Sequence, residues 1–146
     1  MRSKKCKICG DETPENFYSK VNNMCKKHTA ETFIKWTKNN LMQYRFVSAR
    51  NRAKYKNIEF SIVLEDLENI YKKQGGRCYY TNLLFDSSEY GTYSIDRIDS
   101  NLGYTKDNIR LTAACVNYMK NDMEESIFLK VVKLIANNQN VYKNLK

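Results

Sequence analysis

The sequence contains no long hydrophobic segment. None of its apolar stretches approaches the roughly 18 residues that a membrane-spanning helix requires. The first six residues, Met-Arg-Ser-Lys-Lys-Cys, lead into polar sequence and lack the apolar core of a secretory signal. These absences predict a soluble protein that has no membrane partner and acts inside the cell, in the cytoplasm.

Histidine is also scarce in the sequence, and the number of cysteines is odd. The chain has five cysteines, and an odd number in an apparently intracellular protein argues against a disulfide framework. It has one histidine, His28, so any site that needs an imidazole depends on this residue alone.

Acidic side chains are scarce in the first two-fifths of the chain. Residues 1–57 carry 14 Lys and Arg against 4 Asp and Glu, whereas residues 58–146 carry 11 against 12. The net charge of +9 therefore comes from the N-terminal part. This segregation indicates a polyanionic partner. A merely solubilising surface is the alternative, but solubility does not require the charge to be concentrated in one part.

The remaining composition is that of a globular protein. Of the 146 residues, 28% are charged and 42% are hydrophobic, which excludes a disordered chain. The length fits one domain, or a small metal-stabilised module attached to a compact domain. We expect the second arrangement, with a zinc-binding and basic helical segment at residues 1–57 and a compact domain at residues 58–146.

Two short-spaced ligand pairs lie near the N-terminus. Cys6 and Cys9 form C-x2-C, fifteen residues intervene, and Cys25 and His28 form C-x2-H. Zn²⁺ prefers four tetrahedral sulfur and nitrogen ligands, and two such pairs across a loop supply them. Four protein ligands fill the coordination sphere, so the spacing predicts a structural Zn²⁺ whose binding contributes directly to folding.

A basic helix is expected to follow. Apolar residues three or four apart predict a helix over residues 29–57, or two helices with a break near residues 39–40. Five positive charges without an intervening acidic residue repel one another, and a phosphate backbone would relieve that repulsion. A solvated helix face is the alternative. The candidate DNA-binding residues are Arg45, Arg50, Arg52, Lys54 and Lys56.

Residues 58–146 read as short helices and strands. Ser61 can cap a helix that Gly75 and Gly76 end. Apolar and aromatic runs predict strands at 78–85, 93–98 and 109–112, separated by a turn at 86–91 and a polar loop at 99–108. Helices are expected at about 113–121 and 123–136. The last should bury these residues: Ile127, Phe128, Val131, Val132, Leu134 and Ile135.

Several motifs occur together in this domain. Residues 94–108 read SIDRIDSNLGYTKDN, residues 116–120 read VNYMK, and upstream pieces include ARNRAK at 49–54 and GGRCYYT at 75–81. This combination resembles the HNH endonucleases, also called His-Me finger or ββα-metal nucleases. It is most similar to a phage-type branch in which D-R-I-D replaces the usual D-H-I. The resemblance spans about residues 45–135, and the zinc segment resembles modules that often precede such domains.

The resemblance implies an α+β fold with a small ββα-metal core and flanking helices. It also implies hydrolysis of nucleic acid, most simply double-stranded DNA, with one Mg²⁺ or Mn²⁺ that polarises the scissile phosphate. On the matching positions, Asp96 and Asn117 are the expected metal ligands, Asn108 is the middle Asn of the motif, and Lys120 can hold a phosphate. The family is common in phages and mobile elements, which makes a viral source consistent with the sequence.

The sequence departs from the family at the general-base position, where Arg97 stands in place of histidine. An arginine stays protonated at neutral pH and cannot accept a proton from water, although it can bind a phosphate or offset transition-state charge. Water can then be activated as a metal-bound hydroxide, by Asp99 or by Tyr93, and the first two routes are preferred to Tyr93. An inactive site is a further alternative.

Three functions remain open on the sequence. The first is a metal-dependent DNA endonuclease, the second a catalytically silent nucleic-acid-binding protein, and the third a zinc-containing adaptor that contacts RNA or protein.

The four-cysteine cluster of many relatives is absent, because neither Cys78 nor Cys115 has a C-x2-C partner. Both are expected to be buried thiols that act as small apolar groups.

Overall fold

The computed structural model describes residues 4–18, 23–85 and 92–138. They belong to two compact units, Met1–Tyr44 and Arg45–Lys146. The boundary falls within a helix, closer to the N-terminus than the boundary expected after residue 57. No helix in the described ranges is both long enough and apolar enough to span a membrane. The expected turn at 86–91 lies outside the described residues.

The first unit is organised around its cysteines. A short 3-10 helix, η1 (Pro14–Asn16), is followed by α1 (Lys26–Asn39), whose first turn carries His28. The buried side chains of Phe17 and Met24 lie beside those of Cys6 and Cys25, and these four residues form a very small core. Such a core is too small to stabilise a fold without a further constraint.

The predicted break in the basic helix is confirmed. Helix α1 ends at Asn39, its C-cap Asn40 has a φ of −127° and a ψ of 40° that are not helical, and α2 (Leu41–Lys56) begins at the next residue. On the inner face of α2, Ala49 and Ala53 are fully buried. Small side chains at these two positions, four residues apart, allow the α2 backbone to pack closely against the rest of the second unit.

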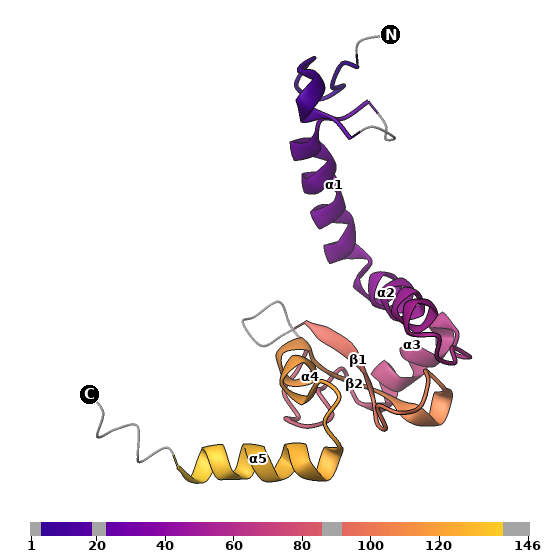
Figure 1. Cartoon of the computed structure of the whole chain (residues 1–146), viewed down its shortest axis with the longest axis vertical. Helices are drawn as coiled ribbons and strands as arrows, with labels where there is room; N and C mark the ends of the chain where they lie inside the picture. The colour runs from indigo at the N-terminus through magenta and orange to yellow at the C-terminus, as the bar shows by residue number, and fades with distance from the viewer. Residues whose placement is uncertain (1–3, 19–22, 86–91, 139–146) are drawn as a thin grey trace. The chain divides into compact units, whose positions relative to one another are not determined.

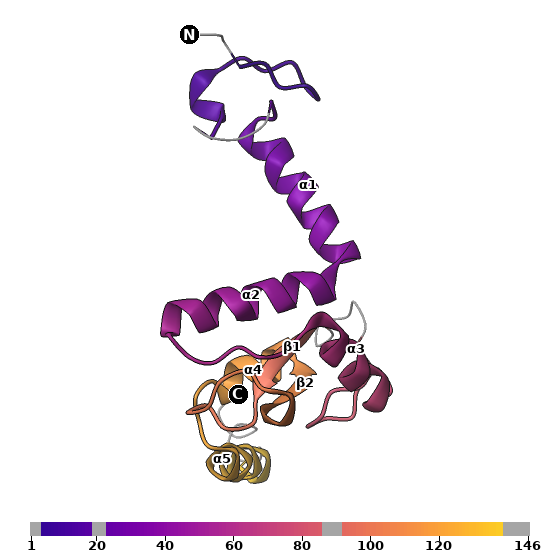
Figure 2. The ribbon, with the colours of Figure 1, turned by 90° about the vertical axis from the view of Figure 1, so that its right-hand side faces the viewer.

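The second unit is built on an antiparallel hairpin, β1 (Tyr93–Arg97) paired with β2 (Ile109–Ala113). Helix α4 (Ala114–Lys120) follows β2 directly and packs on both strands, and α3 (Leu64–Lys73) packs on β2, as Figures 1 and 2 show. This is the predicted ββα arrangement. A second 3-10 helix, η2 (Lys106–Asn108), precedes β2, and α5 (Glu125–Asn137) completes the described chain.

The side chain of Gln74 helps to cover the outer edge of β2. The Gln74 amide donates to the Leu111 carbonyl at 2.8 Å and accepts from the Leu111 N–H at 3.0 Å. Covering an edge strand in this way removes backbone groups that could pair with another chain. It also fixes the end of α3 against the sheet.

A close backbone contact ties the loop after β1 to the segment after α2. Tyr104 N donates to Glu59 O at 2.8 Å, and Ser61 N donates to Tyr104 O at 3.0 Å. A Cβ at Gly103 would lie 2.4 Å from Glu59 O, so only glycine fits at that position without moving the backbone.

Four predictions made from the sequence of residues 58–146 were wrong. Val63, not Ser61, is the N-cap of α3, because Asp66 reaches back to the Val63 N–H at 2.9 Å. Residues 78–85 form turns with one isolated bridge, between Arg77 and Leu84, instead of a strand.

The other two errors concern burial. Cys115 is exposed, whereas Cys78 is buried as expected and accepts a hydrogen bond from the Ala113 N–H at 3.1 Å. In α5 only Phe128 is buried, and the other apolar residues expected in the core remain accessible. A helical pattern of apolar residues shows that a helix has an apolar face but not what covers it.

Candidate zinc centre and candidate active site

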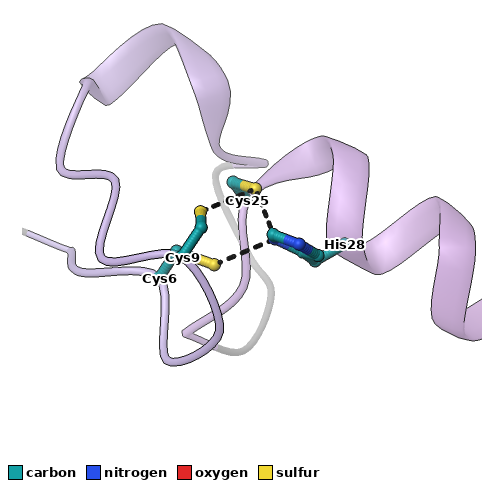
Figure 3. A group of neighbouring side chains, drawn as sticks. All are labelled: Cys6, Cys9, Cys25 and His28. Atoms are coloured by element: carbon teal, nitrogen blue, oxygen red, sulfur yellow. Dashed lines mark hydrogen bonds between the residues drawn. The ribbon is translucent and has the colours of Figure 1, made fainter.

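The four predicted zinc ligands converge in the first unit (Figure 3). All four ligand atoms lie within 4.8 Å of one another. The Cys9 and Cys25 sulfurs are 3.9 Å apart, and His28 Nδ1 lies 3.5 Å from Cys6 Sγ and 3.3 Å from Cys25 Sγ. Around a tetrahedral zinc ion, sulfurs lie about 3.8 Å apart and sulfur and nitrogen about 3.6 Å apart. The donor set and its spacing therefore fit zinc.

The surroundings of the cluster favour metal binding. Burial raises the pKa of the Cys6 thiol, but backbone N–H groups of Cys25, Cys9 and Ile8 outweigh it and hold that pKa at about 5. The thiolate is the form that binds a metal. On the opposite side of the His28 ring, Nε2 faces the Glu31 carboxylate at 3.8 Å. A carboxylate there orients the imidazole so that Nδ1 is the ligand.

A second candidate site is a pocket of about 370 Å³ in the second unit, beside β1 and α4. Four basic residues line it: Arg45, Arg52 and Lys56 from α2, and Arg97 from the end of β1. Positions 45, 52 and 56 lie on one face of a helix because they are seven and four residues apart. The predicted DNA-binding residues Arg50 and Lys54 do not line this pocket.

Arg97 is held in place by three groups. Its guanidinium donates to the Leu102 carbonyl at 2.7 Å, lies 3.5 Å from an Asp122 oxygen, and packs over the Tyr104 ring with 5.5 Å to the centroid. The side chain is only 10% exposed. An arginine fixed in this way presents a positive charge to the pocket at little entropic cost.

Tyr104 and Asp122 connect Arg97 to α2. The Arg52 Nε donates to the Tyr104 hydroxyl at 3.4 Å, and Lys56 Nζ lies 3.6 Å from the second Asp122 oxygen. Sequence reasoning missed both residues as members of the site. Tyr104 stands inside the quoted motif, but Asp122 lies beyond α4, and no pattern in the sequence relates it to Arg97.

Asp96, the expected metal ligand, is 2% exposed and is bonded to two cations. Its Oδ2 accepts from Arg110 Nε at 2.9 Å, and its Oδ1 accepts from Lys120 Nζ at 3.0 Å. Asp96 and Arg110 are direct partners in the hairpin register, which explains their pairing. Lys120, the expected phosphate ligand, is itself fully buried.

The two expected asparagines have different surroundings. The Asn117 amide lies beside β1 and donates to Ser94 Oγ at 2.8 Å and to the Ile95 carbonyl at 3.2 Å. The Asn108 side chain instead spans the loop before it, accepting from Asp99 N and donating to the Gly103 carbonyl at 2.8 Å. Asn108 therefore shapes the loop whose Leu102 carbonyl holds Arg97.

The Asp96 and Asn117 pair does not fit a divalent cation as it is arranged here. Carboxylate and amide oxygens are suitable ligands for Mg²⁺. However, both Asp96 oxygens already accept hydrogen bonds from positive groups. A dication at this position would face Arg110 and Lys120 at close range, and like charges repel strongly where water is excluded.

The two side chains considered for water activation also lie away from the pocket. Asp99 is exposed and accepts from the Asn101 N–H at 2.8 Å, and it does not line the pocket that Arg97 lines. Burial among aromatic rings raises the pKa of Tyr93 to about 12. This shift is opposite to the one a general base at neutral pH requires.

The ββα core defines the class of fold, and comparison with known proteins agrees with it. No family model matches the chain. A solved structure of the rare-cutting HNH restriction endonuclease PacI is similar over 95% of this chain and 97% of that one, with a TM-score of 0.50 and 16% identity. The chain thus has the fold of an HNH nuclease.

A viral protein is similar in sequence. An uncharacterized protein of Acanthamoeba polyphaga mimivirus is 27% identical over 137 residues, which is 89% of this chain. The match covers 24% of the viral protein, so this chain spans about a quarter of that relative's length.

Proposed function

We propose that the chain is an endonuclease that hydrolyses phosphodiester bonds of double-stranded DNA in the pocket around Arg97. The observation that carries this proposal is the group of cations on a ββα nuclease fold: Arg97, Arg52 and Lys56 line one pocket with a single ionisable carboxylate that is well exposed, Asp122. Guanidinium and ammonium groups bind phosphate and stabilise the charge that develops in the transition state.

The proposed reaction begins with a water molecule beside the bound phosphate. The water oxygen attacks phosphorus, the bond from phosphorus to the 3′ oxygen breaks, and the leaving oxygen takes a proton from solvent water, giving a 5′ phosphate and a 3′ hydroxyl. Asp122 is the proposed acceptor of the proton from water. Its ion pairs of 3.5 and 3.6 Å are long and its side chain is 58% exposed, so its oxygens remain accessible to water. Arg97 stabilises the charge on the phosphate oxygens.

The family resemblance also implies Mg²⁺ or Mn²⁺, and the Asp96 carboxylate does not present a ready ligand for it. The proposed steps are therefore assigned to the side chains of the pocket. In this proposal the zinc-binding segment and the basic helices hold DNA, and their contacts should be salt-dependent because counterions leave the duplex on binding.

Nicking of supercoiled plasmid by purified, zinc-loaded protein tests the proposal. The assay compares wild type with Arg97→Ala and Asp122→Asn, in Mg²⁺ and in Mn²⁺. Lys130→Ala is the control because Lys130 is exposed on α5, outside both the pocket and the basic helices. We expect wild type to nick, Arg97→Ala to lose about 10²-fold or more in rate, and Lys130→Ala to stay within about twofold of wild type. Asp122→Asn should also lower the rate, because it removes the proposed proton acceptor.

A catalytically silent DNA-binding protein is the second candidate function. It is favoured by Arg97, which cannot act as a general base, and by the engaged oxygens of Asp96. Salt-dependent DNA binding by wild type without cleavage of DNA or RNA would establish this second function. Binding that does not change with salt would contradict both.

A further inference from the structure

A large aromatic side chain stands exposed at the cationic pocket. Tyr118, in α4, is 88% exposed, and it lines the same pocket as Arg52, Lys56 and Arg97. A ring exposed to this extent buries little apolar surface in its own chain, so the fold gains little from it. Tyr55 of α2 is 92% exposed but does not line the pocket. Among the tyrosines that the structure describes, only Tyr118 is both strongly exposed and part of the pocket.

Helix α4 is fixed to the hairpin on both sides of this exposed tyrosine. One position before it, Asn117 donates to Ser94 Oγ at 2.8 Å and to the Ile95 carbonyl at 3.2 Å. Two positions after it, Lys120 is buried and donates to the Arg97 carbonyl at 3.0 Å. The ring is therefore carried by a backbone that is held in place. A tyrosine also has only two side-chain torsions to restrict when it binds a partner.

The size and chemistry of the pocket match one nucleotide. Its volume of about 370 Å³ lies in the lower part of the range of sites that bind small molecules. A duplex is far too wide to enter it, since the major groove of B-DNA alone is about 12 Å wide. Arg52 and Lys56 from α2 supply charges that bind a phosphate, and Tyr118 from α4 supplies a flat apolar face. A nucleotide joins a phosphate to a flat base in the same way.

We propose that the pocket binds one unpaired nucleotide, whose base stacks on the Tyr118 ring while its phosphate is held by Arg52, Lys56 and Arg97. The inference rests on the proposed function in taking this pocket as the place where the phosphodiester binds. In a paired duplex the neighbouring bases cover both faces of each base, so the ring can stack only on a base that has left the stack. The substrate class is then DNA with an unpaired nucleotide beside the bond that is cut, as at a bulge, gap or flap.

Binding of two matched duplexes tests the stacking. One duplex has a single bulged adenosine, and the other has a nucleotide without a base at the same position, so that only the base differs. Full-length, zinc-loaded wild type should bind the first at least about fivefold more tightly, the lower end of the effect of base stacking on an aromatic ring. Tyr118→Ala should bind both equally, and Tyr118→Phe, which keeps the ring, should match wild type. Fluorescence anisotropy at one salt concentration measures the affinities, because the phosphate contacts depend on salt.

Met119→Ala is the matched control. Met119 is the next residue of α4 and is exposed, but it does not line the pocket. This variant should keep the wild-type ratio of the two affinities. A wild-type ratio in Tyr118→Ala would overturn the inference, because the preference for the base would then arise elsewhere. Equal binding of the two duplexes by wild type would also overturn it.

A measurement on wild type does not depend on the folding of a variant. The bulged base is replaced by 5-iodouracil, which forms a crosslink on irradiation with an aromatic ring stacked against it. Mass spectrometry of the digested complex then identifies the crosslinked residue, and we expect Tyr118. A crosslink only at other residues, or none while the DNA is bound, would contradict the proposal.

A denaturing gel of the same samples scores cleavage separately from binding. A preference for the base that depends on Tyr118, in a chain that never cleaves, supports the stacking and rejects the nuclease. Cleavage by wild type without such a preference rejects the stacking and leaves the nuclease standing.

Discussion

The two units of the chain use opposite means to stabilise their folds. In the first, four ligand side chains are drawn together and the apolar core is very small. In the second, a hairpin and its helices bury a larger set of side chains, among them Leu67, Leu111 and the charged network around Asp96. The first unit therefore relies on a side-chain cluster that fits one metal ion, whereas the second relies on many distributed contacts that include buried charges.

Removal of the metal should have the largest effect, because it should unfold one unit and leave the other folded. Structural zinc contributes on the order of 10 kcal/mol or more to small domains of this kind. Cys6→Ser or His28→Ala should therefore unfold the first unit, weaken DNA binding and leave the second unit folded. Fluorescence of Trp36, the one tryptophan of the chain, reports the first unit, and amide NMR signals of β1 and β2 report the second.

Cys115→Ser is the control for this experiment, because Cys115 lies outside the cluster. Loss of the β1 and β2 signals together with the zinc would show that the two units fold as one. Unchanged DNA affinity in His28→Ala would show that the first unit takes no part in binding.

Breaking the charged network should destabilise only the second unit. Asp96→Ala leaves Arg110 and Lys120 buried without their shared carboxylate, and breaking a buried pair in this way costs about 3–5 kcal/mol. Urea unfolding measures the loss, with Glu68→Ala, an exposed residue of α3, as control. Zinc content should stay constant. A loss below about 1 kcal/mol, typical of surface pairs, would mean that the network is not tightly buried in solution.

Gly103→Ala tests how closely the loop and the segment after α2 approach. The added Cβ would meet Glu59 O at 2.4 Å, and overpacking of this kind costs about 1–3 kcal/mol. Gly75→Ala serves for comparison, because a Cβ there meets nothing within 4 Å although its φ of +61° disfavours alanine. Thermal unfolding should rank Gly103→Ala as the more destabilised. The reverse order would mean that the loop moves away easily.

The smallest expected effect is a response of the second unit to alkaline pH. Burial raises the pKa of Tyr93 to about 12, so the folded state favours the protonated phenol. Its contribution is fully present below the ordinary pKa of about 10 and is lost as the pH rises toward 12. Wild type should lose about 1 kcal/mol more than Tyr93→Phe between pH 9 and pH 11 in urea unfolding. Parallel losses in the two proteins would contradict this assignment.

The sequence predicts most of the fold because the signals are local. Ligand pairs separated by two intervening residues predict the zinc cluster, and the interruption at Asn40 separates α1 from α2 as expected. The hairpin strands and α4 also lie within one or two residues of their predicted bounds. Each of these features depends on residues that are close in the chain.

The arrangement of the candidate site was harder to predict from the sequence, because it depends on strand register and on tertiary contacts. The pairing of Asp96 with Arg110 follows from the hairpin register, and a shift by one residue would have turned Arg110 to the other face. Likewise, nothing in the order of residues indicates that Lys120 turns inward to a carboxylate. The exposed face of α5 shows the same limit, since an apolar pattern does not reveal which residues a neighbour covers.

The hydrogen bond between Arg52 and Tyr104 has a consequence for the time at which the pocket can form. Its two residues are 52 positions apart, and the Asp122 carboxylate that joins Arg97 to Lys56 lies further along the chain. During synthesis the basic helix α2 leaves the ribosome first, and translation adds about 5–20 residues per second. For several seconds, then, a nascent chain carries the positive helix without the tyrosine and the carboxylate that later position its charges. The positive charges of α2 therefore precede the assembled pocket in the life of each molecule.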